Sequence, residues 1–124
     1  SDAYFDGHDY SLIQIGPDVT ISREVMILTH DYSFGAACRS MDIPIHEGEK
    51  ETPHMTGVVS IGAHTFVGAR ASLLPETHIG QGCIIGACAV VKGNIPDYSI
   101  VVGNPGKIVG DVREWTKKKL QKDW

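Results

Sequence analysis

The chain has 124 residues and a mass of 13.4 kDa, a size that fits one domain over residues 1–124. Apolar residues make up 42% and charged residues 21%, which excludes a disordered chain. Eleven Lys and Arg against 15 Asp and Glu give a formal charge of −4, so no nucleic-acid partner, which would need a large basic surface, is expected. No run of about 18 apolar residues is present, and the sequence therefore predicts no membrane span.

The three cysteines, Cys38, Cys83 and Cys88, are an odd number and have no CxxC spacing. This pattern predicts neither a disulfide framework nor a zinc ribbon. It is typical of a reducing compartment, and residues 1–10 lack the basic and apolar stretches of a signal peptide. We therefore expect a cytoplasmic location.

In chain order, composition and spacing divide the sequence into six segments. These are a polar lead-in (1–9), first strands (10–31), an insertion (about 33–57), a repeat region (58–96), a closing region (97–110) and a C-terminal helix (about 111–122). The helix is predicted from Val112, Trp115 and Lys119, which recur at spacings of three and four. An insertion of this length is expected to act as a lid or binding loop, and the alternative is a plain surface loop.

A six-residue repeat defines both strand regions. Its leading position holds Ile, Val or Leu each time: Ile15, Ile21, Ile27, Ile61, Val67, Leu73, Ile79, Ile85 and Val91. Six is a multiple of two and not of 3.6, so the leading residue and the small or β-branched residue two before it face inward on a short strand. Gly often follows the leading residue, which predicts a corner where the backbone needs positive φ or a close approach. Many such sides in succession predict a parallel β-helix, in which each coil pairs with the next.

Outward residues recur on the same side every 18 positions. The period places Phe66 with Ile84 and, if the register persists, with Val102. It also groups Ser60 with His78 and Pro96, and Ser72 with Val90. An exposed apolar column of this kind predicts a subunit interface or a ligand wall, although scattered apolar residues on a surface are also common.

The repeated pattern [LIV]-G-x-x-[small]-x, over about residues 11–112, resembles the hexapeptide-repeat acyltransferases. The resemblance implies an all-β fold, a left-handed parallel β-helix of hexapeptide repeats with an inserted loop and a short C-terminal helix. It also implies a homotrimer with active sites between subunits.

The segment VTISREVMILTHDYS, which ends at Ser33, resembles a stretch of the sugar O-acetyltransferases of this superfamily in which the histidine is the general base. The resemblance implies that His30 is the catalytic base. The chemistry fits, because histidine is the side chain that ordinarily changes charge near neutral pH. The alternative is a structural histidine at a loop boundary. Asp31 is expected to point elsewhere, so a backbone carbonyl or an acid of the insertion is left to orient the ring.

The segment YSIVVGNPGK, which ends at Lys107, resembles the tail of the acetyl-CoA-dependent members. The resemblance implies that Lys107 lies near a phosphate of coenzyme A, and the alternative is a solvated lysine. It implies that Phe66, which stands for the family's usual Trp, borders the pantetheine and acceptor site. Ala69 and Ala87 match positions whose backbone N–H groups bond the pantetheine amides.

Two departures from the family pattern stand beside these residues. Cys88 replaces a usual Gly and would narrow the pantetheine channel. Gly93 replaces a frequent Lys, which would weaken coenzyme A binding, and Lys92 is expected to compensate. Neither departure removes the proposed base.

The remaining histidines are expected to be peripheral. His64 and His78 fall at a corner and at an outward position, whereas His46 and His54 lie in the insertion, where they could contact an acceptor. The γ-class carbonic anhydrases use the same scaffold but need two histidine ligands five residues apart, a spacing absent here. No metal site is therefore expected.

Together these residues predict an acetyl-CoA-dependent O-acetyltransferase, with acetyl-CoA as cosubstrate, that acts on a hydroxyl of a sugar-type acceptor by direct transfer. Two alternatives stay open. One is a nucleotide-sugar N-acetyltransferase, and the other is a non-catalytic hexapeptide-repeat scaffold or binding protein.

Overall fold

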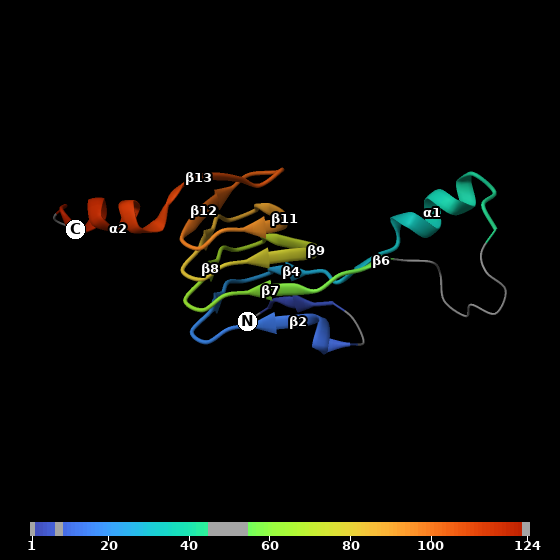
Figure 1. Ribbon diagram of the computed structural model, residues 1–124, viewed down its shortest axis with the longest axis horizontal. Coiled ribbons are helices and arrows are strands. Elements are labelled where there is room, and N and C mark those ends of the chain that lie inside the picture. The colour runs from blue at the N-terminus through green and yellow to red at the C-terminus, as the bar shows by residue number, and fades with distance from the viewer. Residues whose placement is uncertain (1, 7–8, 45–54, 123–124) are drawn as a thin grey trace.

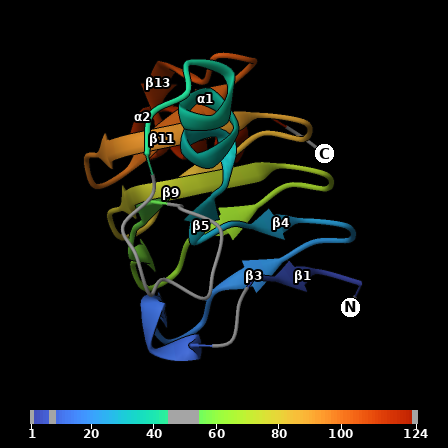
Figure 2. The same cartoon turned by 90° about the vertical axis from the view of Figure 1, so that its right-hand side faces the viewer.

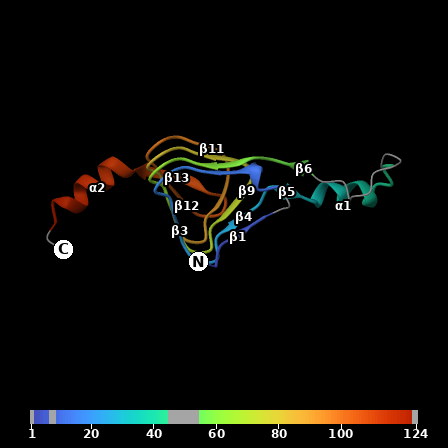
Figure 3. The same cartoon turned by 90° about the horizontal axis from the view of Figure 1, so that it is seen from below.

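The computed structural model describes residues 2–6, 9–44 and 55–122. Short strands wind into a three-sided prism, and helices α1 (Ser33–Ser40) and α2 (Val112–Leu120) project from it in different directions (Figure 1). Seen from below, the coils lie over one another and the two helices leave from different corners (Figure 3). None of the helices in the described part of the chain is both long and apolar enough to cross a bilayer.

Strands of successive coils pair in parallel on three faces. The first face contains β3 (Thr20–Ile21), β8 (Phe66–Val67), β10 (Ile84–Ile85) and β12 (Ser99–Val102), with the return strand β13 (Lys107–Asp111) antiparallel to β12. The second face contains β1 (Tyr4–Phe5), β4 (Met26–Ile27) and the first residues of β9 (Ser72–Ile79) and β11 (Val90–Ile95). The third face contains β2 (Ile13–Ile15), which follows the 3-10 turn η1 (Tyr10–Leu12), then β7 (Val59–Ile61) and the last residues of β9 and β11. The parallel β-helix predicted from the six-residue repeat is thereby confirmed.

The interior of the prism is built from the two inward positions of each repeat. Leu73 and Ile85 are fully buried at the leading position, and Val25 and Ala71 are fully buried two residues before it. Buried polar residues satisfy their hydrogen bonds inside the prism, as when Thr77 donates to the carbonyl of Val91, in the next coil, at 3.0 Å. β-branched and small residues pack well on a pleated interior, so the repeat itself specifies the core.

The glycines that follow the leading residues serve close approach and not positive φ. A Cβ on Gly62 would lie 2.5 Å from the carbonyl carbon of Gly80 and 2.6 Å from the nitrogen of Gln81, in the next coil. Positive φ instead recurs three residues after the leading position, at Asp18, Glu24, His64, Arg70, Glu76, Gly82 and Cys88. Two reasons were predicted for glycine at the corner, positive φ and a close approach of the backbone. Close approach is the one that applies.

The last coil is two residues shorter than the others, which shifts two of the predicted outward columns. Ile85 pairs with Val101, 16 positions on, and the register of β11 slips between Val91 and Gly93. As a result, Ile84 is followed by Ile100 and not by Val102. His78 is followed by Asn94 and not by Pro96, whereas the pairing of Ser72 with Val90 is confirmed.

The insertion contains regular structure that the sequence analysis did not predict. Its first part forms α1, which buries Gly35 and Cys38. The residues just before the insertion pair with its last part, because β5 (His30–Asp31) is antiparallel to β6 (Met55–Thr56). Figure 2 shows the chain continuing from β5 into α1. The insertion therefore begins with a helix that follows a pair of short strands, and not with a loop. Residues 45–54, which include His46 and His54, lie outside the described residues.

The C-terminal helix is confirmed as α2. Asp111 caps it, because its carboxylate accepts a hydrogen bond from the backbone N–H of Arg113 at 2.8 Å. Every residue of α2 is at least partly exposed, and Trp115 is 45% exposed.

Candidate active site

His30 lies at the corner between the second and third faces, where the chain leaves the prism for the insertion. The carboxylate of Asp6 defines its surroundings: one oxygen, Oδ2, accepts hydrogen bonds from the backbone N–H groups of Thr29 and His30, both at 3.0 Å. The same oxygen lies 3.3 Å from Nδ1 of His30, and the hydroxyl of Thr29 lies 3.0 Å from that nitrogen. Asp6 reaches this place because β1, which precedes it, pairs with β4, which precedes His30. We call this corner, with Asp6, Thr29 and His30, the histidine edge.

The charge state of Asp6 suits a histidine base. The side chains of His30 and Asp6 are 14% and 18% exposed. Burial raises the pKa of the Asp6 carboxyl, but hydrogen bonds from Thr29 and His30 lower it by more, so that it lies below its ordinary value. The carboxylate is therefore ionised at neutral pH and can accept a hydrogen bond from Nδ1–H, the tautomer of neutral imidazole that carries its lone pair on Nε2.

Two further charged residues border the histidine edge. Asp31 points away from the ring of His30, as expected, because its carboxylate accepts a hydrogen bond from the N–H of Ser33 at 2.8 Å. Hydrogen bonds from Ser33 and, more weakly, the positive charge of Lys92 hold the pKa of Asp31 below its usual value. Strand register places Lys92 at this corner, because Val91 and Ile27 both pair with Leu73 and are each followed by the turn toward the third face.

Three of the residues predicted to bind the cosubstrate lie along a different corner, between the first and second faces. Ala69 and Ala87 are one coil apart, and the N–H of Cys88 donates to the carbonyl of Ala69 at 2.9 Å. The turn that follows Gly103 covers the end of this corner, and Lys107, which is exposed, begins β13 there. We call this corner, with Ala69, Ala87 and Lys107, the alanine edge.

Phe66 lies on the first face, beside the alanine edge. Its ring is 41% exposed and lies between Thr20 and Ile84 in a column that continues to Ile100. This column forms one wall of a largely apolar cleft of about 660 Å³, whose other wall includes Trp115 of α2. The predicted apolar column is therefore present, with Ile100 in place of Val102.

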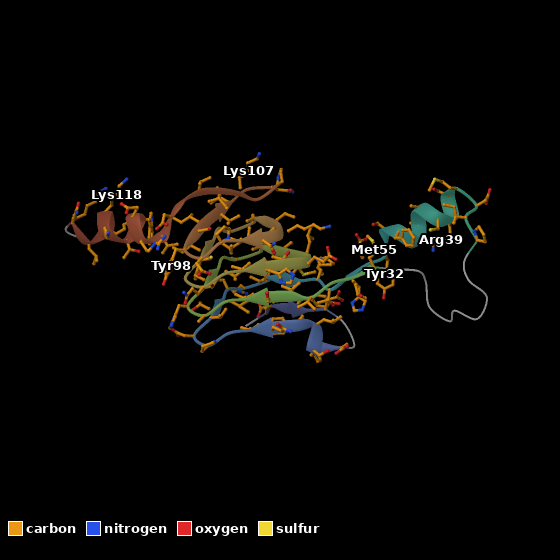
Figure 4. All side chains as sticks on the ribbon, in the orientation of Figure 1. Tyr32, Arg39, Met55, Tyr98, Lys107 and Lys118 are labelled. Carbon is orange, nitrogen blue, oxygen red and sulfur yellow. The ribbon has the colours of Figure 1, made fainter. Side chains whose placement is uncertain are left out.

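The structure thus separates the six predicted site residues into two groups within one chain. His30 and Lys92 lie on the histidine edge, whereas Phe66, Ala69, Ala87 and Lys107 lie on or beside the alanine edge. Residues 25–29 span the second face between these edges, a distance of about 13 Å at the usual rise per residue. In Figure 4, Tyr32 and Met55 lie on the α1 side of the prism, away from Lys107 of the alanine edge.

The residues that orient His30 were missed by the sequence analysis. Asp6 lies 24 positions before His30, in a lead-in that does not share the phase of the repeat. The pairing of β1 with β4 alone brings it to the ring, and nothing in the spacing signals that pairing. Among the residues that the structure describes, no group of three His, Cys, Asp or Glu side chains is arranged to hold a metal ion.

Comparison with known proteins places this geometry in a family. The family description "bacterial transferase hexapeptide (six repeats)" matches residues 59–93. A probable acetyltransferase of Mycobacterium tuberculosis is 38% identical over 100 residues, which are 81% of this chain and 31% of that protein. The putative lipopolysaccharide biosynthesis O-acetyl transferase WbbJ of Escherichia coli is 32% identical over 105 residues, 85% of this chain and 53% of WbbJ.

Among solved structures, a variant of AntD, an N-acyltransferase from Bacillus cereus in complex with dTDP and coenzyme A, superposes with a TM-score of 0.65. The identity is 23%, over 88% of this chain and 60% of AntD, so this match concerns the fold. The chain spans about a third to a half of the length of the two curated relatives described above. The stacked hexapeptide repeats and the similarity to these relatives show that the chain belongs to the hexapeptide-repeat acetyltransferase superfamily.

Proposed function

We propose that the chain transfers an acetyl group from acetyl-CoA directly to a hydroxyl of a sugar-type acceptor, with His30 as the general base. The contact between His30 Nδ1 and the ionised carboxylate of Asp6 carries this proposal. A carboxylate on one ring nitrogen fixes the tautomer and stabilises the imidazolium that forms during proton transfer. WbbJ, whose name states an O-acetyl transfer, supports a hydroxyl acceptor.

The proton movements follow from this arrangement. Nε2 of His30 takes the proton of the acceptor hydroxyl as the oxygen attacks the thioester carbonyl. Backbone N–H groups would stabilise the oxyanion so formed. When the carbon–sulfur bond breaks, Nε2 returns the proton to the leaving thiolate, so that the base is restored and no covalent acyl-enzyme is needed. Acetyl-CoA supplies the activated acetyl group.

The alanine edge offers the chemistry that coenzyme A needs. The methyl side chains of Ala69 and Ala87 leave room beside the backbone, and exposed Lys107 offers a cation to a phosphate. Phe66 would border the pantetheine arm. Lys92, on the histidine edge, would contribute a positive charge near the reacting end and not near the phosphates.

We further propose that the working site lies between copies of the chain in a homotrimer. His30 and the alanine edge are held apart by the second face, which favours a site that takes one edge from each of two copies. Charge favours contact between copies: residues 107–124 contain six basic and three acidic residues, whereas residues 1–106 contain five basic and 12 acidic residues. Segments of unlike charge favour a head-to-tail contact, and such a contact forms a ring when the rotation between copies closes.

Mixing two inactive variants tests the shared site. We expect His30→Ala and Ala87→Trp each to be inactive as pure proteins. If the site joins two chains, randomly mixed trimers pair an intact histidine edge with an intact alanine edge at about one interface in four, and about a quarter of the wild-type activity returns. Mixed trimers without activity would place both edges of each site in one chain and contradict the proposal.

Substitution of the base tests the reaction itself. We expect His30→Ala to lower kcat/KM about 10²- to 10⁴-fold, the usual contribution of a general base. His64→Ala is the matched control, because Nδ1 of His64 also lies near a carboxylate, that of Asp18 at 2.8 Å, but on an exposed corner. A His30→Ala variant as active as His64→Ala would refute the proposed base.

The alternatives differ in acceptor or in activity. AntD favours an N-acyl transfer to a nucleotide-linked sugar, which an amine acceptor in the same assay would reveal. A scaffold would bind no acetyl-CoA. The cytoplasmic location stays a prediction.

A further inference from the structure

The third face of the prism carries an outward column of a different kind from the other two. Strand register places four polar side chains one above another, and we call them the polar column: Gln14, Ser60, His78 and Asn94. The corresponding columns are mostly apolar on the first face (Thr20, Phe66, Ile84, Ile100) and on the second face (Tyr4, Met26, Ser72, Val90). The difference is not explained by the repeat, which leaves outward positions unspecified.

A cleft of about 640 Å³ runs beside the polar column. Its lining includes His78 and Asn94 of the column, together with Glu76 and Leu12. The face that carries it is turned toward the viewer in Figure 1, where β2, β7, β9 and β11 are labelled.

The cleft adjoins the candidate base. Thr56, which also lines it, is the strand partner of His30, and the N–H of the lining residue Gly57 donates to the carbonyl of Thr29 at 2.9 Å. At the other end, Leu12 closes the short turn that begins after Asp9. The carboxylate of Asp9 caps this turn, because it accepts a hydrogen bond from the backbone N–H of Ser11 at 2.9 Å.

The chemistry of the polar column suits sugar hydroxyls. Amide, hydroxyl and imidazole groups both donate and accept hydrogen bonds, as sugar hydroxyls do. Ser60 Oγ and His78 Nδ1 already lie 2.9 Å apart, so these two side chains are held in place before a ligand binds. Neighbouring strands are about 4.8 Å apart, so four positions span about 14 Å, which is longer than a single sugar ring.

We propose that the third face binds a neutral, extended saccharide along the polar column, so that one of its hydroxyls reaches His30. The acceptor class is then an oligosaccharide or polysaccharide and not a monosaccharide. This inference rests on the proposed function for the hydroxyl at His30, but binding along the column does not require acetyl transfer.

Binding of saccharides of increasing length tests the inference. The probes are neutral oligosaccharides of one to six units of glucose, galactose, mannose or N-acetylglucosamine, titrated without acetyl-CoA into the wild type and followed by saturation-transfer NMR. In at least one series, Kd falls at least tenfold between one and four units. Ser60→Ala and Asn94→Ala each weaken binding of the four-unit sugar about fivefold, the effect of one lost hydrogen bond.

Two controls separate the possible outcomes. Ser72→Ala removes the same hydroxyl from the second face and leaves every Kd unchanged, and His30→Ala keeps the dependence on length. Affinity that does not depend on length in all four series, or that Ser60→Ala and Asn94→Ala leave unchanged, overturns the inference. Length-dependent binding without acetyl transfer to any of these sugars supports it and counts against the proposed function instead.

Discussion

The contact between Asp6 and His30 can be tested by removing one charge. A single oxygen, Oδ2 of Asp6, makes all three contacts, two to backbone N–H groups and one to the ring of His30. In Asp6→Asn the amide oxygen takes that place, because an NH₂ group there would face two N–H donors. The variant therefore keeps the hydrogen bonds that hold Thr29 and loses the negative charge.

The size of the effect follows from the distance. At 3.3 Å, the attraction between a carboxylate and an imidazolium is about 1 kcal/mol in bulk water and about 5 kcal/mol at an effective dielectric constant near 20. The side chains of His30 and Asp6 are 14% and 18% exposed, so their environment lies between water and that dielectric constant. We therefore take the attraction lost in Asp6→Asn to be about 2–3 kcal/mol. The predicted fall in kcat is about 30- to 160-fold, with little change in KM, because Asp6 acts through His30.

The assay is release of the coenzyme A thiol with the saccharide acceptor that gives the highest wild-type rate. Asp18→Asn is the control, because Asp18 makes the corresponding contact with exposed His64, and its kcat should stay within about twofold of the wild type. A folded Asp6→Asn variant with kcat within about threefold of the wild type would show that no charged partner is needed, and the reasoning would be wrong.

Three further predictions concern the prism and its last helix. Leu73→Ala, at a fully buried position, should lower the free energy of unfolding by about 3 kcal/mol in denaturant titrations, whereas Leu120→Ala, 79% exposed, should change it by less than about 0.5 kcal/mol. Gly62→Ala should lower it by more than about 2 kcal/mol, because the new Cβ would lie 2.5 Å from a backbone carbon of the next coil; an unchanged midpoint would contradict the close approach. The hydrogen bond from Arg113 holds the pKa of Asp111 at about 2, below its ordinary value of 3.8. The cap of α2 should therefore be fully formed above pH 3.8 and be lost as the pH falls through about 2. Amide exchange at Arg113 measures this loss, and Asp111→Ala should show weak protection at every pH.

The prism could be predicted from the sequence because the six-residue period fixes which residues face inward and how often the chain turns. Leu73 and Ile85 are inward because six is a multiple of the strand period, and the C-terminal helix follows from the local spacing of Val112, Trp115 and Lys119. The register of the last coil was not predictable in the same way. Its shortening by two residues depends on the slip between Val91 and Gly93, and an unbroken period places Val102 where Ile100 lies.

The candidate site was only partly visible in the sequence. His30 was identified from a resemblance around the strand that precedes it. Its partner Asp6 was not, because the contact depends on the pairing of β1 with β4, which carries no periodic signal. The separation of His30 from the alanine edge is a property of the closed prism, in which residues close in sequence occupy different corners.

Acetyl-CoA binding tests the central claim most directly. Calorimetric titration of the wild type should give a Kd in the micromolar range, about 1–100 μM, and Lys107→Ala should weaken it about tenfold, which is the loss of one cation–phosphate contact. Lys122→Ala, which removes a lysine from the end of the chain beyond α2, should leave the Kd unchanged. The absence of binding to the folded protein at millimolar acetyl-CoA would contradict the claim that this chain is an acetyl-CoA-dependent transferase.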